Sequence, residues 1–135
     1  MNDNQGAKLK REDLIYPNLC YQIMGILFQV FKNIGFGYKE KIYHKAIIEE
    51  FKTLKIPFHS ELPVKINYKN KIIGLYYFDF LIDDKIILEI KVRNYFSKKD
   101  IDQLYSYLKA KNLKLGILVH FTRTGAKFKR IVNIK

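Results

Sequence analysis

Apolar residues recur three and four positions apart in the amino-terminal half of the chain, and this spacing predicts two helices. The first begins at Pro17, a residue that suits the first helical position, and ends near Gly35. After a break at residues 35–37, the same spacing predicts a second amphipathic helix that continues to Leu54. The apolar positions of the first helix are Leu19, Ile23, Ile26, Leu27, Val30 and Phe31.

Beyond the second helix the pattern changes to one that predicts strands. Pro57 and Pro63 bracket a connector, and residues 64–68 and 71–75 then predict a hairpin around Lys69-Asn70.

The most informative segment is a second hairpin, with the sequence YFDFLIDDKIILEIK. Its arms are rich in β-branched and aromatic residues, and residues 83–85 between them have polar turn chemistry. With these residues as the loop, Ile82 faces Ile86 and Asp79 lies directly opposite Glu89. Like charges at opposed positions destabilise a strand pair, so this register predicts a neutralising partner.

Two opposed carboxylates beside a lysine indicate a divalent cation next to a phosphate. Glu89 and Lys91 share a face because side chains alternate along a strand. Oxygen ligands suit a hard cation, and a lysine meets developing negative charge. The competing interpretation is a solvated sheet face on which Lys91 pairs with one acid. Three apolar residues are expected on the acidic face, which favours the site: Tyr77, Leu81 and Ile87.

A third helix is predicted over residues 97–111, opened by Ser97 and Asp100 as a capping-box signature. Gln103 and Tyr107 lie on nearly the opposite side from its apolar arc, so they face either a cleft beside the acidic hairpin or solvent. The apolar arc consists of Ile101, Leu104, Tyr105 and Leu108.

Apolar runs at residues 115–121 and 130–134 predict two final strands. The predicted order is therefore helix, helix, several antiparallel strands, helix, strand, strand.

Length and composition bound the class of protein. A chain of 135 residues forms one domain, here residues 14–135, preceded by a polar flexible tail at residues 1–13. A hydrophobic content of 48% excludes disorder of the whole chain. No apolar run approaches the roughly 20 residues that span a bilayer, and the polar start lacks the apolar region of a signal peptide. We therefore expect a cytoplasmic protein without membrane contact.

The net charge of +12 predicts attraction to polyanions, of which nucleic acid is the commonest in a cytoplasm. Lysine outnumbers arginine, which suits backbone phosphates better than base reading. Cys20 is the only cysteine, so neither an internal disulfide nor a thiolate zinc site can form, and its apolar surroundings predict a buried side chain.

The other polar candidates have simpler interpretations. Glu40 opens the second helix, where the helix dipole favours a carboxylate, so capping is preferred from periodicity alone. His44, His59 and His120 lack the spacing of a zinc helix and are interpreted as surface or structural residues. No serine or cysteine motif for nucleophilic catalysis is present, so hydrolysis would need an activated water.

With these residues in view, the chain resembles the GxxExxY family of the PD-(D/E)xK nuclease-like superfamily. Residues 37–43, GYKEKIY, fit the name-giving pattern. Asp79 followed by Glu89-Ile90-Lys91 fits the superfamily core, and Gln103 with Tyr107-Leu108-Lys109 resembles its QxxxYLK-like helix. Two departures are Phe78 in place of a common proline and His120-Phe121 in place of a usual asparagine-phenylalanine pair.

The resemblance implies a restriction-endonuclease-like α/β core, in which a mixed sheet is flanked by helices. It implies Asp79 and Glu89 as ligands of Mg²⁺, with Mn²⁺ as a substitute, the Ile90 carbonyl as a further ligand and Glu40 reaching the same site. Lys91 would position or activate the attacking water and stabilise the phosphate. Gln103 would support the cleft.

The expected function is a Mg²⁺-dependent nuclease that hydrolyses phosphodiester bonds of DNA or RNA. The alternatives are a non-catalytic nucleic-acid-binding module that keeps the fold and an accessory subunit of a larger complex. The retained Asp79, Glu89 and Lys91 favour the enzyme. Many nucleases of this superfamily pair to cut two strands, so the resemblance leaves both a monomer and a homodimer open.

Overall fold

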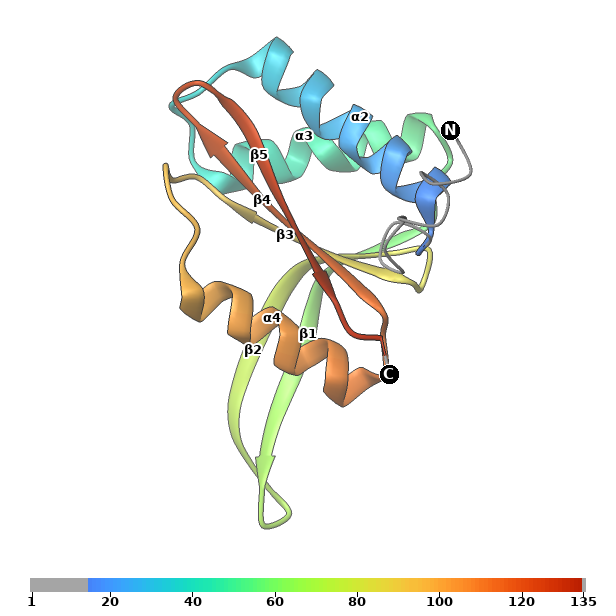
Figure 1. The fold of residues 1–135 in the computed structure, drawn as a ribbon, viewed down its shortest axis with the longest axis vertical. Helices are drawn as coiled ribbons and strands as arrows, with labels where there is room; N and C mark the ends of the chain where they lie inside the picture. Colours follow the sequence, from blue (N-terminus) through green and yellow to red (C-terminus); the bar gives the residue numbers. More distant parts are fainter. Residues whose placement is uncertain (1–14, 135) are drawn as a thin grey trace, which may run out of the picture.

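The computed structural model describes residues 15–134, which form a five-stranded sheet with helices on both faces (Figure 1). The predicted tail at residues 1–13 lies outside the described residues. The elements are α2 (Pro17–Ile34), α3 (Glu40–Thr53), β1 (Phe58–Tyr68), β2 (Lys71–Ile82), β3 (Ile86–Lys91), α4 (Lys98–Lys111), β4 (Leu115–Thr122) and β5 (Gly125–Val132). Strand order follows the chain, and β3 pairs with β4 in parallel while the other neighbours are antiparallel. The expected mixed α/β architecture is confirmed.

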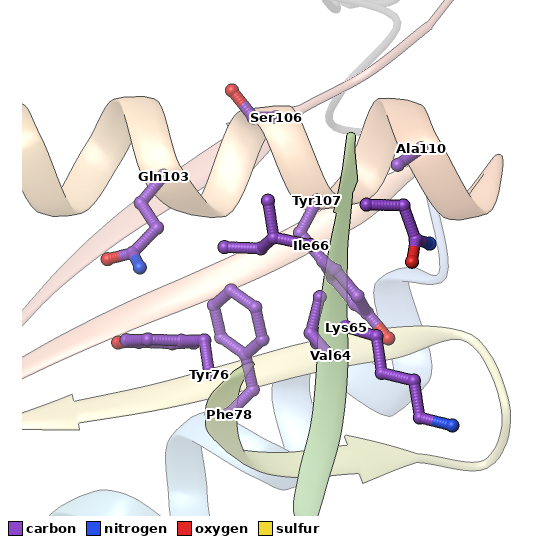
Figure 2. Close-up of a pocket in the computed structure, with 10 residues that line it drawn as sticks. Val64, Lys65, Ile66, Tyr76, Phe78, Gln103, Ser106, Tyr107 and Ala110 are labelled. Carbon is purple, nitrogen blue, oxygen red and sulfur yellow. The ribbon is translucent and has the colours of Figure 1, made fainter. Parts of the chain in front are cut away.

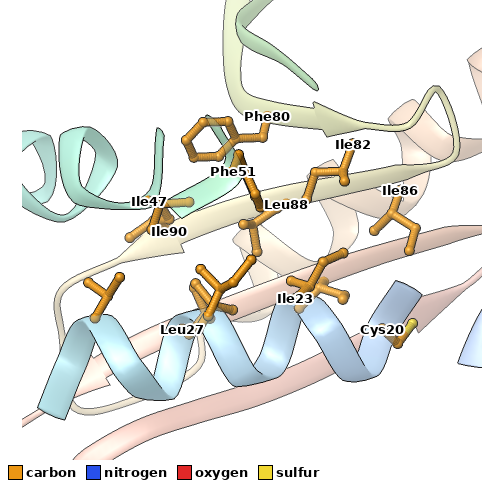
Figure 3. Close-up of a cluster of buried hydrophobic side chains, with 14 of the residues drawn as sticks. Cys20, Ile23, Leu27, Ile47, Phe51, Phe80, Ile82, Ile86, Leu88 and Ile90 are labelled. Atoms are coloured by element: carbon orange, nitrogen blue, oxygen red, sulfur yellow. The ribbon is translucent and has the colours of Figure 1, made fainter. Parts of the chain in front are cut away.

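The helices divide the core into two layers. Helices α2 and α3 cover one face of the sheet, and α4, the crossover between the parallel strands β3 and β4, covers the other (Figure 1). The larger layer packs Ile23 and Leu27 of α2 and Phe51 of α3 against β2 and β3 (Figure 3). Cys20 lies in this layer, buried as predicted.

The two predicted amino-terminal helices are confirmed, including Pro17 at the start of α2 and Gly35 at its end. The turn between them depends on two residues. Gly37 has a φ of 114°, a backbone conformation that residues with a Cβ rarely adopt. Tyr43 is fully buried on α3, and its hydroxyl donates to the carbonyl of Gly35. Together they fix where α3 begins.

The first predicted hairpin is confirmed but is much longer than the sequence indicates. Strands β1 and β2 extend beyond the rest of the sheet as a two-stranded arm, the pale green projection in Figure 1, which turns at Lys69 and Asn70. The prediction that Pro63 bounds a connector is wrong, because Pro63 lies inside β1 and pairs with Tyr77. Strand β1 is the edge of the sheet, and an edge strand tolerates a residue without a backbone N–H.

The alternation of side chains along β2 slips by one residue at Asp79. Tyr76 and Phe78 pack on the α4 side of the sheet, whereas Phe80 packs on the α2 and α3 side although its parity is the same. The β1–β2 register skips Glu61, between the pairs Ser60 with Phe80 and Leu62 with Phe78, and Glu61 has a left-handed φ of 53°, which marks an irregularity in β1 at the level of Asp79. The prediction that Tyr77 shares the acidic face is therefore wrong: its side chain is 56% exposed.

The carboxyl-terminal elements match their predictions in kind. Strand β4 is confirmed, and the last strand, Gly125–Val132, begins earlier than the predicted 130–134. Helix α4 begins after Ser97, but Ser97 makes no side-chain capping hydrogen bond, so the capping-box interpretation is wrong. Among the described residues, no helix is long and apolar enough to cross a membrane.

Candidate functional site

The candidate site lies where β2 separates from β3. These strands pair over only three residue pairs, in the predicted register, from Ile82 with Ile86 to Phe80 with Leu88. At the next position, Asp79 and Glu89, hydrogen bonds between side chain and backbone replace the backbone pairing. The N–H of Asp79 donates to Oε1 of Glu89 at 3.0 Å, and the N–H of Ile90 donates to Oδ2 of Asp79 at 2.8 Å. The structure therefore brings the two predicted carboxylates together at a fork in the sheet.

The remaining carboxylate oxygens contact residues from both layers. Oδ1 of Asp79 lies 3.2 Å from Nδ1 of His44, whose ring stacks on Phe80 at 4.3 Å. Oε2 of Glu89 accepts a hydrogen bond of 2.6 Å from the hydroxyl of Tyr76. His44 is thus a structural histidine of the site and not a surface residue.

The electrostatics of the fork favour an additional cation. Glu89 is only 5% exposed, and its burial together with the negative charge of Asp79 raises its pKa to about 8. Burial and the hydrogen bond to Glu89 also raise the pKa of Tyr76. Lys91 is the nearest positive charge described, with Nζ 3.9 Å from Oε2 of Glu89. Two carboxylates that lie close together with little access to solvent repel each other, and a divalent cation between them would stabilise the charged form of both.

The donor set fits a particular kind of cation site. No group of three or more histidine, cysteine, aspartate or glutamate side chains within residues 15–134 is arranged to hold a metal. Asp79 and Glu89 would therefore supply two ligands of a shell that the described side chains do not complete. Mg²⁺ commonly binds through one or two carboxylates and takes its other ligands from water and substrate phosphates, so these residues fit Mg²⁺ better than a closed all-protein site.

Lys91 lies between two carboxylates. Its Nζ is 3.9 Å from Oδ1 of Asp100 on α4, as far as it is from Glu89. The other oxygen of Asp100, Oδ2, lies 3.1 Å from NH1 of Arg93. The Asp100 carboxylate, interpreted from sequence as a helix cap, therefore holds the two basic side chains that follow Glu89.

His120 lies beside Lys91 on the adjacent strand β4 and is 1% exposed. Its ring contacts Phe96 edge-on at 4.0 Å between centroids. Burial and the positive charge of Arg93 lower its pKa to about 4. Neither ring nitrogen has a hydrogen-bond partner in the described part of the chain, so His120 is a buried neutral residue beside the lysine.

The structure places Glu40 differently from the acidic pair. Glu40 is the first residue of α3 and is exposed, one helical turn before His44 and on the same side of the helix. Within residues 15–134 its side chain forms no hydrogen bond or ion pair. His44 brings this face of α3 to Asp79, so Glu40 lies on the helix face that approaches the fork.

Gln103 lines a pocket of about 570 Å³ between α4 and the arm of β1 and β2 (Figure 2). Tyr107 lines it too, is buried, and packs on Phe78 at 4.7 Å. The interpretation that these two residues face a cleft is therefore favoured over full exposure. Tyr76 forms part of the same wall, so the pocket adjoins the acidic pair.

Sequence reasoning missed several residues of the site. His44 lies four positions after Glu40, which is the one signal that could have placed it on the same helix face. Tyr76 had no usable signal, because strict alternation puts it on the opposite face from Glu89. Arg93 follows Lys91 by two positions, the period of a strand, and this spacing is the one signal that could have placed the two basic side chains together.

Comparison with known proteins agrees with this geometry. Residues 17–131 match the family model of the PD-(D/E)XK nuclease superfamily. A solved structure titled "Crystal structure of SSO0001" is 22% identical and superposes with a TM-score of 0.52, over 70% of this chain and 51% of that chain. The chain thus spans about half the length of that structure, and the likeness at this identity concerns the fold alone. The comparison with curated proteins gave no match.

The mixed sheet with flanking helices is the restriction-endonuclease-like fold. Because the family match covers nearly all of the described residues and includes the forked acidic pair with its lysine, the chain belongs to the PD-(D/E)XK nuclease superfamily.

Proposed function

We propose that this protein is a Mg²⁺-dependent nuclease that hydrolyses phosphodiester bonds of DNA or RNA, with Mn²⁺ as a substitute metal. The observation that carries the proposal is the pairing of the buried Glu89 with the half-buried Asp79, joined at 3.0 Å through the Asp79 N–H, with Lys91 3.9 Å from Glu89. The net charge of +12 supports a polyanionic substrate.

In this proposal Asp79 and Glu89 hold the metal, and the Ile90 carbonyl and Glu40 complete the protein ligands. When bound, Mg²⁺ would polarise the phosphate and lower the pKa of a water molecule. Lys91 orients the attacking water and stabilises the negative charge that develops on the phosphate. Asp100 holds Lys91 in place from the opposite side, and Gln103 supports the cleft.

We also infer membership of the GxxExxY family within the superfamily. In the pattern of that family, Gly37 and Tyr43 fix the turn between α2 and α3. Glu40 lies between them and, in this proposal, is the residue of the motif that binds metal. A cytoplasmic location, pairing into a homodimer and a single domain over residues 14–135 stay predictions.

The deciding experiment is calorimetric titration of Mg²⁺ and Mn²⁺ into the wild type and Asp79→Asn. In parallel, each protein is incubated with single-stranded, duplex and branched DNA and RNA. Asp83→Asn is the matched control, because Asp83 lies in the turn of the same hairpin with a left-handed φ of 52° that asparagine tolerates. We expect metal uptake and cleavage in the wild type and control, and neither in Asp79→Asn. Nucleic-acid binding without metal uptake or cleavage in the wild type would instead assign a non-catalytic binding module.

A further inference from the structure

One side chain connects the acidic pair to the pocket beside it. The hydroxyl of Tyr76 donates to Oε2 of Glu89 at 2.6 Å, and the Tyr76 ring forms part of the wall of the pocket between α4 and β1. The pocket and the candidate site are therefore separated by no more than the length of a tyrosine side chain.

The pocket has the chemistry of a site for a flat, weakly polar group. Tyr76 and Phe78 meet edge to face at 4.8 Å, and Tyr107 packs on Phe78 from α4. Val64 and Ile66 of β1 supply the aliphatic side (Figure 2). Gln103 contributes an amide, which offers both a donor and an acceptor.

Among residues 15–134, no carboxylate lines this pocket, and the one charged residue in its wall is Lys65, which is exposed on β1. The wall of the pocket therefore presents no negative charge that would repel a polyanionic chain.

We propose that this pocket receives an unpaired base of the nucleic-acid substrate, so that the protein acts on single-stranded segments. The proposal rests on the nuclease function inferred above. A base has two apolar faces and a polar edge, which match aromatic walls and one amide. A sugar separates a base from its phosphate much as the Tyr76 ring separates the pocket from Glu89, so one nucleotide can occupy both places. A base that remains stacked in a duplex cannot enter a pocket of this kind.

The first test changes the substrate and leaves the protein intact. Fluorescence anisotropy in EDTA measures the binding of the full chain to a labelled single-stranded oligonucleotide, to its duplex, and to a series in which one position at a time is abasic. We expect the single strand to bind more tightly than the duplex. We expect one abasic position, and not the others, to weaken binding by roughly 5- to 150-fold, the range for loss of one stacked base.

The second test blocks the pocket. Ile66 lies in the pocket wall and is 48% exposed, so Ile66→Trp fills the space without disturbing the core. The matched control is Ile73→Trp, on β2 of the same arm, where Ile73 is 64% exposed and is not part of the wall. We expect Ile66→Trp to remove the difference between the intact and abasic oligonucleotides, and Ile73→Trp to retain it. Thermal melting of both variants verifies that each is folded.

The outcomes separate this proposal from the nuclease function. Base-dependent binding in EDTA, with no cleavage after Mg²⁺ or Mn²⁺ is added, would refute the nuclease and retain the pocket. Cleavage with equal affinity for single strand, duplex and every abasic oligonucleotide would retain the nuclease and overturn the pocket. If Ile66→Trp leaves single-strand binding unchanged but converts a dimer to a monomer in sedimentation, the occupant is a second copy of the chain and the proposal is wrong.

Discussion

Asp79 and Glu89 are joined through the backbone: the N–H of Asp79 donates to the Glu89 carboxylate, and the N–H of Ile90, the residue after Glu89, donates to the Asp79 carboxylate. These two bonds take the place of strand pairing where β2 leaves β3. The fork is therefore held by the same groups that are proposed to bind metal, which makes its stability sensitive to their charge.

The metal-free protein should lose stability as the pH rises from about 4.5 to about 8. Folded Glu89 has a pKa of about 8 against an ordinary value of 4.5, so its contribution is fully present below 4.5 and is lost as the pH rises through 8. The loss is roughly 1.4 kcal/mol for each unit between the two pKa values. Urea denaturation in EDTA at several pH values measures it. Glu89→Gln should remove the dependence of stability on pH in this range. Mg²⁺ at pH 8 should restore stability to the wild type only. A wild-type midpoint that is constant from pH 5 to pH 8 would contradict the prediction.

Protonation of His120 should lower the stability of the folded protein at acid pH. Its folded pKa of about 4 lies below the ordinary 6.5, so its contribution is present above 6.5 and is lost as the pH falls through 4. His120→Asn should therefore unfold at lower pH in an acid titration followed by circular dichroism. His59→Asn is the control, because the His59 side chain is 66% exposed. Equal acid midpoints for His120→Asn and the wild type would show that protonation of His120 does not oppose folding.

Tyr76→Phe should weaken metal uptake near neutral pH. The Tyr76 hydroxyl bond favours the charged form of Glu89, so its removal raises the Glu89 pKa further and leaves less carboxylate to bind metal. A hydrogen bond to a charged group contributes about 1.5–3 kcal/mol, which corresponds to roughly a 10- to 150-fold change in affinity. Mn²⁺ titration calorimetry measures the change. Tyr77→Phe, at the exposed neighbour, should bind Mn²⁺ as the wild type does.

Asp100→Asn should lower cleavage while leaving the fold and metal uptake intact. Asp100 lies 3.9 Å from Lys91 and is ion-paired with Arg93, so its loss leaves the lysine without the contact that fixes its position on the α4 side. A supporting residue of this kind typically contributes on the order of 10-fold or more. The effect should appear in kcat and not in KM. Asp102→Asn, on the exposed side of the same helix, pairs with Lys98 and should cleave normally.

The residues around Glu40 should divide into structural and chemical roles. Gly37→Ala should lower the free energy of unfolding by about 1–3 kcal/mol, because alanine is strained at a φ of 114°. Tyr43→Phe should lower it by about 1 kcal/mol through loss of the bond to Gly35. Glu40→Gln should leave denaturation unchanged and weaken Mg²⁺ binding. Stability loss in Glu40→Gln with normal metal affinity would return Glu40 to a helix-capping role.

Local sequence signals were sufficient for the acidic hairpin. Its turn residues and β-branched arms determine the register that pairs Ile82 with Ile86, and this register alone brings Asp79 to Glu89. The helices were predicted for the same reason, since the spacing of Ile23 and Leu27 depends only on the helical period. The acidic pair could therefore be predicted from residues that lie close together along the chain.

The rest of the site depends on contacts between distant segments. The bend that brings Tyr76 to Glu89 involves Glu61 on another strand, and no pattern within β2 reveals it. His44 reaches Asp79, 35 positions away, only because α3 packs on Phe80. Asp100 was explained by a local cap that the folded chain does not use, because Lys91 and Arg93 compete for its carboxylate.

The arm of β1 and β2 gives the protein a part that can change length without altering the chemistry. Beyond Phe78 its strands pair only with each other, and it turns through Lys69 and Asn70, both with left-handed φ. Insertion or removal of whole residue pairs near this turn would deepen or shorten the wall beside α4 while Asp79 stays in place. Related proteins that share the acidic fork would thus differ in the substrates that they bind when the length of this one hairpin differs.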